Sequence, residues 1–333
     1  MPRTPRNFNA LRALTPLACI CLTALAGTAC LADVFVSSEK DNAILQLDAE
    51  GKVIRSIAVC KRPRHMAGLK DVATGNTRIM VACGDSDQLG VVDLASGKMI
   101  DTVPTGESPE IFALSPDGKT AYVSIEDENL VAAYDISSKK PVFSVKTGAE
   151  PEGVLASPDG KSVYATSEVA SSIYRIDVDK RKVVAQVKVG LRPRRFVLSP
   201  DALELWVSNE LGASVSIIDT RSMKLKQTLQ FNVTGMRASD ITPVGMVMSA
   251  DGKTVWVALG RANHVAEVDA ATRTVKGLAL VGKRAWGLAL SKDGSRLYVA
   301  NGLSDDMTII DTANRKPLKT VPVGREPHSI LVD

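Results

Sequence analysis

The sequence has 333 residues, with 41 Lys and Arg against 37 Asp and Glu, so its formal net charge is only +4. Residues 1–32 hold three of the Arg and no acidic residue, which leaves the remainder of the chain at +1. So balanced a charge carries no electrostatic footprint for nucleic acid, and we expect no nucleic-acid partner.

Residues 1–32 have the pattern of a secretory signal peptide. Arg3, Arg6 and Arg12 precede an apolar run, and small residues lead to a predicted cleavage after Ala32. We therefore predict a periplasmic or secreted protein whose mature chain is residues 33–333.

Two alternatives to a cleaved signal peptide are a membrane anchor and a lipidated cysteine. A membrane anchor is disfavoured because the apolar run is short and contains Pro16, and no other stretch is apolar enough to span a bilayer. Lipidation of Cys30 stays open, although the residues before it, 27–29, match a lipoprotein site poorly.

An apolar strand that ends on Asp recurs seven times, at Asp48, Asp93, Asp135, Asp177, Asp219, Asp269 and Asp311. The steps are 45, 42, 42, 42, 50 and 42 residues, and such a period indicates a repeat architecture. Because Asp at a strand end commonly bonds the next turn, we interpret these residues as turn formers rather than metal ligands.

Two further signals keep the same period. A Ser-Pro-Asp-Gly-Lys turn joins two short alternating strands at residues 115–119 and 157–161, with looser copies at 199–201, 249–253 and 291–294. A Gly-x-x-Pro loop precedes the first strand at residues 106–109, 148–151, 190–193 and 324–327. Each unit therefore contains four antiparallel strands, which is one propeller blade.

The ends of the mature chain complete one blade together. Residues 34–39 match a second strand and residues 327–332 match a first strand, so pairing them leaves no open sheet edge. We predict an all-β, seven-bladed β-propeller in a single domain, with blade 1 shared between the termini. The other blades are predicted to start near Pro63, Pro109, Pro151, Pro193, Pro243 and Ala285.

Cys60 and Cys83 are the cysteines outside the signal peptide. Cys60 replaces the Gly of a Gly-x-x-Pro loop, and Cys83 ends the neighbouring strand of blade 2 at the same end of the sheet. In an oxidising compartment this pair predicts a disulfide, with two free thiols as the alternative.

The Gly-x-x-Pro loops and the loops after each second strand share one face, and on this face the repeats differ in chemistry. After the Pro position stand Arg64, Glu110, Glu152, Arg194, Val244, Trp286 and His328; at the ends of the second strands stand Glu39, Glu126, Glu168 and Glu210, with Arg261 in blade 6. We predict that the charged and aromatic members line the channel mouth, where propellers usually bind. The alternative is a solvated rim of mixed charge.

Within this mouth, Arg194 and Glu152 are predicted to clamp a polar or anionic ligand, with Trp286 as a stacking wall. We expect Arg194 and Trp286 to be rim positions whose replacement leaves folding intact. Extra residues around 232–240 lengthen the loop that enters blade 6 on the same face, as binding loops often do.

A metal site is a weaker hypothesis, with His65, His328 and Glu110 as its candidate ligands. No haem-attachment motif, nucleophile elbow or phosphate-binding glycine loop is present. We therefore predict no catalytic residue and no cofactor, and leave PQQ and a divalent metal open.

The in-phase Gly-x-x-Pro, Ser-Pro-Asp-Gly-Lys, Tyr-Val-Ser/Ala-Asn and Ile-Asp-Thr motifs resemble those of YVTN-type seven-bladed β-propeller repeat proteins. A closer resemblance is to the bacterial PQQ-dependent catabolism-associated β-propellers, through residues 84–87, 109–113, 126–130, 150–153, 191–196, 243–245 and 258–263. This resemblance implies a periplasmic protein that accompanies alcohol oxidation by quinoprotein systems. Cys60 departs from the Gly of that family, which leaves the expected fold unchanged.

We favour a binding or accessory role over catalysis, for a small polar ligand or a protein partner. The partner implied by the resemblance is a periplasmic quinoprotein dehydrogenase or a transport component, and we expect a monomer. The alternative is a lactonase-like hydrolase with a metal at the channel mouth.

Overall fold

The computed structural model describes residues 1, 2, 33–70 and 77–333. The predicted signal peptide and its cleavage site lie almost entirely outside these residues. The chain separates into two units, Met1–Leu31 and Ala32–Asp333, and the second is the folded unit described below. No helix among the described residues is long and apolar enough to cross a membrane.

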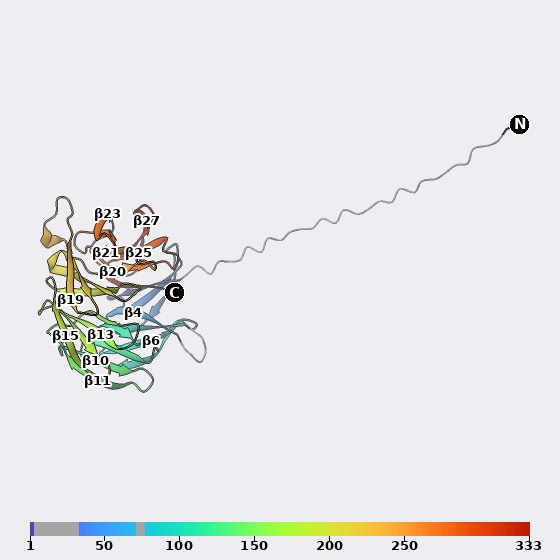
Figure 1. Ribbon diagram of the computed structural model, residues 1–333. Helices are drawn as coiled ribbons and strands as arrows, with labels where there is room; N and C mark the ends of the chain where they lie inside the picture. Colours follow the sequence, from blue (N-terminus) through green and yellow to red (C-terminus); the bar gives the residue numbers. More distant parts are fainter. Residues whose placement is uncertain (3–32, 71–76) are drawn as a thin grey trace. The chain divides into compact units, whose positions relative to one another are not determined.

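The folded unit consists of seven four-stranded antiparallel sheets, as predicted (Figure 1). Blade 1 contains β28 (Pro327–Val332), β1 (Val34–Ser38), β2 (Ala43–Leu47) and β3 (Val53–Ala58). Blade 2 contains β4 (Pro63–Lys70), β5 (Thr77–Cys83), β6 (Gln88–Asp93) and β7 (Lys98–Pro104). Blade 3 contains β8 (Pro109–Leu114), β9 (Thr120–Ile125), β10 (Leu130–Asp135) and β11 (Lys140–Lys146).

The remaining blades follow in chain order. Blade 4 contains β12 (Val154–Ala156), β13 (Ser162–Ser167), β14 (Ser172–Asp177) and β15 (Lys182–Lys188); blade 5 contains β16 (Pro193–Leu198), β17 (Glu204–Asn209), β18 (Ser214–Asp219) and β19 (Lys224–Gln230). Blade 6 contains β20 (Met246–Met248), β21 (Thr254–Ala258), β22 (His264–Asp269) and β23 (Thr274–Leu280); blade 7 contains β24 (Ala285–Leu290), β25 (Arg296–Asn301), β26 (Asp306–Asp311) and β27 (Lys316–Pro322). Short 3-10 helices η1 (Glu210–Gly212) and η2 (Ala238–Asp240) lie in loops.

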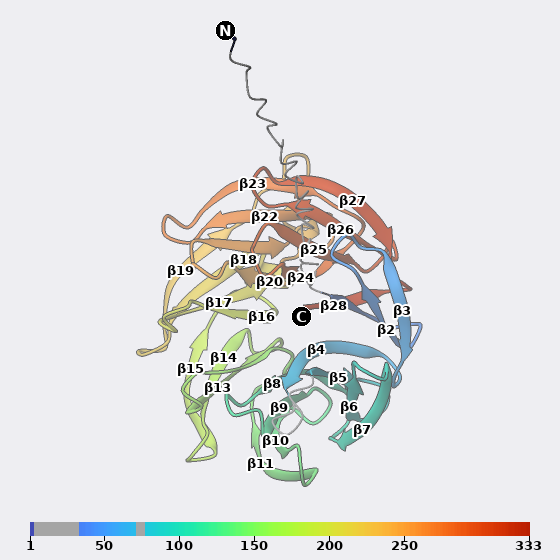
Figure 2. The same ribbon diagram turned by 90° about the vertical axis from the view of Figure 1, so that its right-hand side faces the viewer.

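The blades form a ring in which the first strand of each blade faces the centre and the fourth lies outside (Figure 2). The ring closes by pairing β1 with β28, from Val34 opposite Val332 to Ser38 opposite Pro327. The predicted sharing of blade 1 between residues 34–38 and residues 327–332 is therefore confirmed.

The core lies between neighbouring blades. Val34 and Leu47 of blade 1, for example, pack with Tyr298 and Met307 of blade 7, and all four are almost fully buried. The outermost strands are mostly exposed instead, as β19 and β27 are. Each sheet thus buries both faces of its inner strands against the next sheet, which explains their continuous apolar runs.

The predicted turns gather on one side of the ring, which we call the turn face. In the turn at 115–119, the Ser115 hydroxyl donates to Asp117 at 2.6 Å and accepts the Thr120 N–H at 2.9 Å. The recurring Asp residues also cap turns: the Asp135 carboxylate accepts the Ser138 N–H at 2.6 Å. Their interpretation as turn formers is consistent with these bonds.

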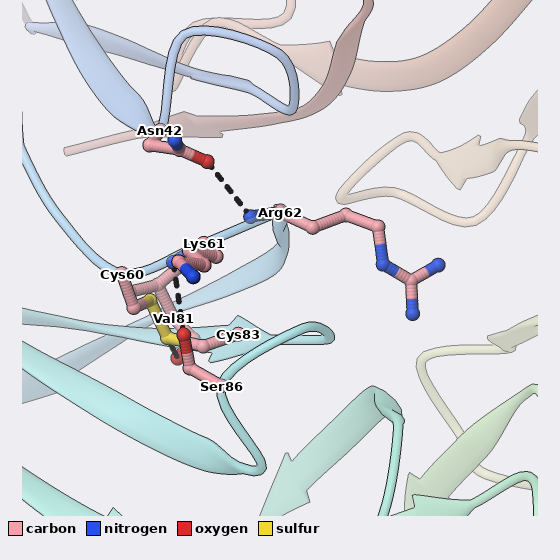
Figure 3. Close-up of a disulfide and its surroundings, with 7 residues drawn as sticks. All are labelled: Asn42, Cys60, Lys61, Arg62, Val81, Cys83 and Ser86. Atoms are coloured by element: carbon pink, nitrogen blue, oxygen red, sulfur yellow. Dashed lines mark hydrogen bonds between the residues drawn. A yellow bond between two sulfur atoms is a disulfide. The ribbon is translucent and has the colours of Figure 1, made fainter.

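The opposite side, which carries the Gly-x-x-Pro loops, is the mouth face. There Cys60 and Cys83 form the predicted disulfide, with their Cα atoms 5.6 Å apart (Figure 3). Beside it, the Lys61 N–H donates to the Ser86 hydroxyl and the Arg62 N–H donates to Asn42 Oδ1, each at 3.0 Å (Figure 3). The blade 2 loop is therefore attached to both blade 1 and its own second strand.

The long loop entering blade 6 is anchored at both ends. Phe231, Val233 and Ile241 are buried in the core between blades 5 and 6, whereas residues 234–240 are mostly exposed. Strands β12 and β20 begin three residues after Pro151 and Pro243, where the other first strands begin at the Pro position. The blade starts are otherwise as predicted.

Candidate functional site

The residue directly after the Pro position of each loop supplies most of the chemistry at the mouth face. Glu110 is 0 %, Glu152 2 %, Arg194 6 %, Trp286 6 % and His328 5 % exposed. The expectation that Arg194 and Trp286 are exposed rim positions is therefore wrong. These side chains are buried because each lies against residues of neighbouring blades.

The four glutamates at the ends of second strands are held by a recurring backbone bond. The N–H of each donates to the carbonyl of the residue before the Pro position, at 2.8 to 3.5 Å, in Glu39, Glu126, Glu168 and Glu210. The repeat thus delivers their carboxylates to the same end of the channel. In blade 6 the corresponding residue is Gly260, and Arg261, which follows it, is exposed.

Arg194 organises one half of the cluster. Its Nη1 pairs with Glu168 and lies 3.3 Å from Glu152 Oε2, and its Nε lies 3.3 Å from Glu210 Oε2. Arg192 Nε donates to Glu168 Oε2 at 2.6 Å and lies 3.3 Å from Glu210 Oε2. Blades 4 and 5 therefore bring three carboxylates and two guanidinium groups together. Arg194 and Glu152, which were predicted to clamp a ligand, are paired with each other and with neighbouring charged groups.

Arg64 organises the other half. It pairs with Glu110, and its Nε lies 3.3 Å from Glu39 Oε1. Arg62 contributes Nη2 to Glu110 Oε1 at 3.1 Å and Nε to Asp85 Oδ1 at 2.7 Å. Glu110 is fully buried and therefore depends on both arginines for its stability as an anion.

Arg195 connects the two halves across the channel. Its Nη1 pairs with Glu152 of blade 4, and its Nη2 lies 3.3 Å from His328 Nε2 of blade 1. The same His328 Nε2 lies 3.8 Å from Glu39 Oε1. A continuous network therefore runs from blade 1 through Arg195 to blades 4 and 5.

Burial and charge shift the pKa values of this network in opposite directions. Burial raises the pKa of Glu39, Glu126 and Glu168 despite nearby arginines. Burial also acts to raise the pKa of Glu152, but Arg194, Arg195 and Arg64 together outweigh it and lower the pKa. Such separated acidities are typical of functional sites.

His65 and His328 both have lowered pKa values. Burial lowers the pKa of His65 to about 3, aided by Arg195, and its ring packs edge-on against Phe112 with centroids 5.1 Å apart. Burial and then Arg64 lower the pKa of His328 well below its usual value.

The three carboxylates Glu110, Glu126 and Glu152 offer oxygen atoms that all lie within 4.8 Å of one another. Of the predicted metal ligands, only Glu110 belongs to this group; among the described residues, His65 and His328 do not join it. Glu126 is the member with no hydrogen bond or ion pair to its carboxylate in the described part of the chain.

Trp286 lies among cations. The guanidinium of Arg194 is 5.3 Å and that of Arg284 is 4.5 Å from its ring centroid, and the His328 ring centroid is 5.8 Å away. The wall that Trp286 was predicted to provide is thus covered in part by protein. Cation–π contacts of this kind stabilise the arrangement by about 0.5–2 kcal/mol each.

Sequence reasoning singled out Arg194 but not Arg62, Arg192, Arg195 or Arg284, although all four adjoin or follow a loop's Pro position. The signal was available in the arginines of 191–196. What was missing was the reach of each side chain, since Arg195 contacts a residue 133 positions away.

The geometry defines a seven-bladed repeat propeller with a charged axial site. Residues 34–243 match the family model described as YNCE-like beta-propeller, and the chain belongs to this family. A search of curated protein sequences finds no match.

Solved structures share the fold. Kuenenia stuttgartiensis hydrazine synthase is similar with a TM-score of 0.75 and 25% identity, over 84% of this chain and 92% of that one. The Pseudomonas aeruginosa periplasmic gluconolactonase PpgL is similar with a TM-score of 0.76 and 19% identity, over 91% of this chain and 99% of that one. A putative 6-phosphogluconolactonase from Bacteroides uniformis is similar with a TM-score of 0.74 and 15% identity, over 91% of this chain and 99% of that one.

Proposed function

We propose that this protein is an exported binding propeller that takes a small polar ligand at the channel mouth and has an accessory rather than a catalytic role. The observation that carries the proposal is the buried Arg/Glu network of the mouth face. Charged groups converge there from blades 1 to 5, whereas the turn face has bonds within each turn and ion pairs between neighbouring blades, such as Arg296 with Glu50 and Arg273 with Glu204.

A comparison within the repeat argues that folding does not require these charges. Val244 occupies the position of Arg194 and Glu152 in blade 6 and is 0 % exposed, so the fold accepts an apolar side chain there. Burying ions costs several kcal/mol each, and apolar replacements of buried ion pairs are often neutral or stabilising. A role in recognition accounts for keeping the charges at the other positions.

Export is the proposed location, with the periplasm as the compartment. The Cys60–Cys83 disulfide supports it, because disulfides persist in oxidising compartments. A link to PQQ-dependent alcohol oxidation, with a quinoprotein dehydrogenase or transport component as partner, rests on the sequence resemblance alone.

The test begins with a thermal-shift panel on the mature protein, containing small acids, amines, alcohols, sugars, PQQ and Ca²⁺. Hydrogen-exchange mass spectrometry with any compound that raises the melting temperature then locates the site. We expect protection in peptides covering the loops 106–110, 190–195 and 283–287, and none in the turns 115–119 and 157–161. Protection confined to the turns, or no stabilising compound, contradicts the proposal.

The carboxylate group of Glu110, Glu126 and Glu152 favours one second candidate, a lactonase-like hydrolase that uses a divalent cation. Three carboxylates suit Ca²⁺, Mg²⁺ or Mn²⁺, which prefer oxygen ligands. We place it second because Glu110 and Glu152 already pair with arginines, which a cation would have to displace. Elemental analysis and lactone hydrolysis by Glu126→Gln, with the neighbouring exposed Asp127→Asn as control, test it.

A further inference from the structure

A cavity of about 100 Å³ lies at the mouth face where blades 7, 1 and 2 meet. Arg284, Trp286 and Gly302 of blade 7 line it, together with Glu39, Glu326 and Arg64. Since a cavity of about 150 Å³ holds benzene, this one has room for roughly four to six non-hydrogen atoms.

The cavity wall carries two arginines and two glutamates, but one of the arginines has no ion-pair partner in the described part of the chain. Arg64 pairs with Glu39 at 3.3 Å, and Glu326 pairs with Lys40 at 3.8 Å. Arg284 has no carboxylate partner in the described part of the chain, and its guanidinium contacts the Trp286 ring face instead. Arg284 is therefore the arginine of the wall that is free to pair with an added carboxylate.

Two sister residues show what Arg284 lacks. Arg62, Arg192 and Arg284 occupy the same repeat position, each with a positive φ, of 50°, 56° and 60°. Arg62 pairs with Asp85 and Glu110, and Arg192 pairs with Glu168 and Glu210. Arg284 alone of these three is left without an acid.

The missing acid has an identifiable place. The Gly302 N–H donates to the Arg284 carbonyl at 3.0 Å, as the Glu210 N–H does to the Arg192 carbonyl at 2.8 Å, so Gly302 is the blade 7 equivalent of Glu210. A Cβ atom at Gly302 would meet only the backbone oxygens of Pro327 and Arg284, at 3.5 and 3.8 Å. The cavity exists where blade 5 has a glutamate side chain.

Two wall residues also have unsatisfied polar atoms. Trp286 Nε1 and His328 Nδ1 are buried and lack a hydrogen-bond partner among the described residues. Buried polar atoms of this kind are uncommon and destabilising, and they often mark the place where a water or an ion binds. A molecule bound in the cavity could supply hydrogen-bond partners for these two atoms.

We propose that this cavity binds a small carboxylate, whose carboxylate group takes the place of the absent glutamate and pairs with Arg284 beside Trp286. The planar guanidinium matches a carboxylate in a two-bond geometry. This inference rests on the proposed binding function and gives its ligand a chemical class.

The test measures binding of acetate, glycolate and lactate to the full mature protein by calorimetry, with acetamide as the neutral isostere and inorganic phosphate as a different anion. We expect the carboxylates to bind and acetamide not to. Arg284→Gln should weaken carboxylate binding about tenfold or more, because a charged hydrogen-bonded pair is lost. Arg261→Gln, an exposed arginine of the same face, should change it less than twofold.

Gly302→Glu provides an independent variant, since it supplies the missing acid from within. It should abolish carboxylate binding while leaving the melting temperature unchanged or raised. Equal binding of acetamide, tighter binding of phosphate, or unchanged affinity in both Arg284→Gln and Gly302→Glu overturns the inference. If another class of compound binds at the mouth face, only this inference fails; if nothing binds, the proposed function fails with it.

Discussion

The turn face and the mouth face are built from the same repeat and differ in what they keep constant. On the turn face, the Ser-to-Asp bond recurs in five turns at 2.6 to 2.7 Å, with the same residue types each time. On the mouth face the backbone bond recurs, but the side chains range from Val244 to Arg194 and Trp286. Local bonds between the same residue types therefore specify the fold at the turn face. At the mouth face, backbone bonds, the disulfide and side-chain bonds such as that of Asn42 to the Arg62 N–H hold the loops, which leaves the side chains after the Pro position free to differ.

The largest effect is expected from deleting residues 327–333, which belongs to neither face and tests the ring that both share. The deletion removes β28 and exposes the edge of β1, so cooperative unfolding should be lost and aggregation should increase. Calorimetry and light scattering measure this. A truncated protein that melts like the full chain would contradict the shared blade.

Arg194→Ala tests the mouth face at the arginine that pairs with three carboxylates. It leaves Glu152, Glu168 and Glu210 without a cation that they share, and breaking a buried pair costs about 3–5 kcal/mol. Urea unfolding measures the free energy of unfolding. Arg261→Ala is the matched control and should change it by less than about 0.5 kcal/mol; a similarly small loss in Arg194→Ala would show that the network is not held by this residue.

Replacing both Cys60 and Cys83 with Ser removes the covalent tie of the mouth face. The disulfide closes a loop of 23 residue steps, for which chain entropy predicts a loss of roughly 3 kcal/mol. Unfolding experiments on the double variant test this, and intact-mass analysis with and without reductant verifies the bond. Two alkylatable thiols in the native, unreduced protein would refute it.

Acid should weaken the buried mouth through its histidines. The folded-state pKa of His65 is lowered from 6.5 to about 3, so the unfolded chain binds the extra proton and stability falls as the pH falls between these values. The free energy of unfolding should therefore decline less between pH 7 and pH 4.5 in His65→Gln than in the parent protein. If the free energy of unfolding fell equally with pH in both proteins, His65 would not be a cause of the acid sensitivity.

The smallest effect is expected on the turn face, from Asp135→Ala. Hydrogen bonds from the Ser138 backbone lower the pKa of Asp135, so its contribution is present above the unfolded value near 3.8 and is lost at lower pH. The variant should melt at a slightly lower temperature at pH 7, with a reduced difference from the parent at pH 2.5. A loss larger than that of Arg194→Ala would reverse the contrast between the faces.

The fold could be predicted from the sequence because the turns of each blade have recognisable local sequence motifs. The turn at 115–119, the strand ending on Asp135 and the loop at 106–109 are local signals that need no long-range information. The pairing of β1 with β28 followed because the two end segments matched complementary strands.

The site could be predicted only as a set of positions. Arg64, Glu110 and Arg194 were placed on the correct face, but their burial was missed because it depends on side chains from other blades. Arg195 reaches His328 across the channel, and Glu110 lies beside Glu126 rather than beside a histidine ligand. The repeat period gives the blade of a residue and its position along the strand, whereas its side-chain partners depend on how the ring closes.

The closure of blade 1 also determines the order in which the molecule can mature. The Asp333 N–H bonds the Asp33 carbonyl, and β1 finds its inner neighbour almost a whole chain length away. During synthesis from the N-terminus, β1 therefore has one unpaired edge until Pro327–Val332 has emerged. Contacts so distant in sequence slow folding, and we expect the incomplete ring to be the species that proteases and chaperones recognise.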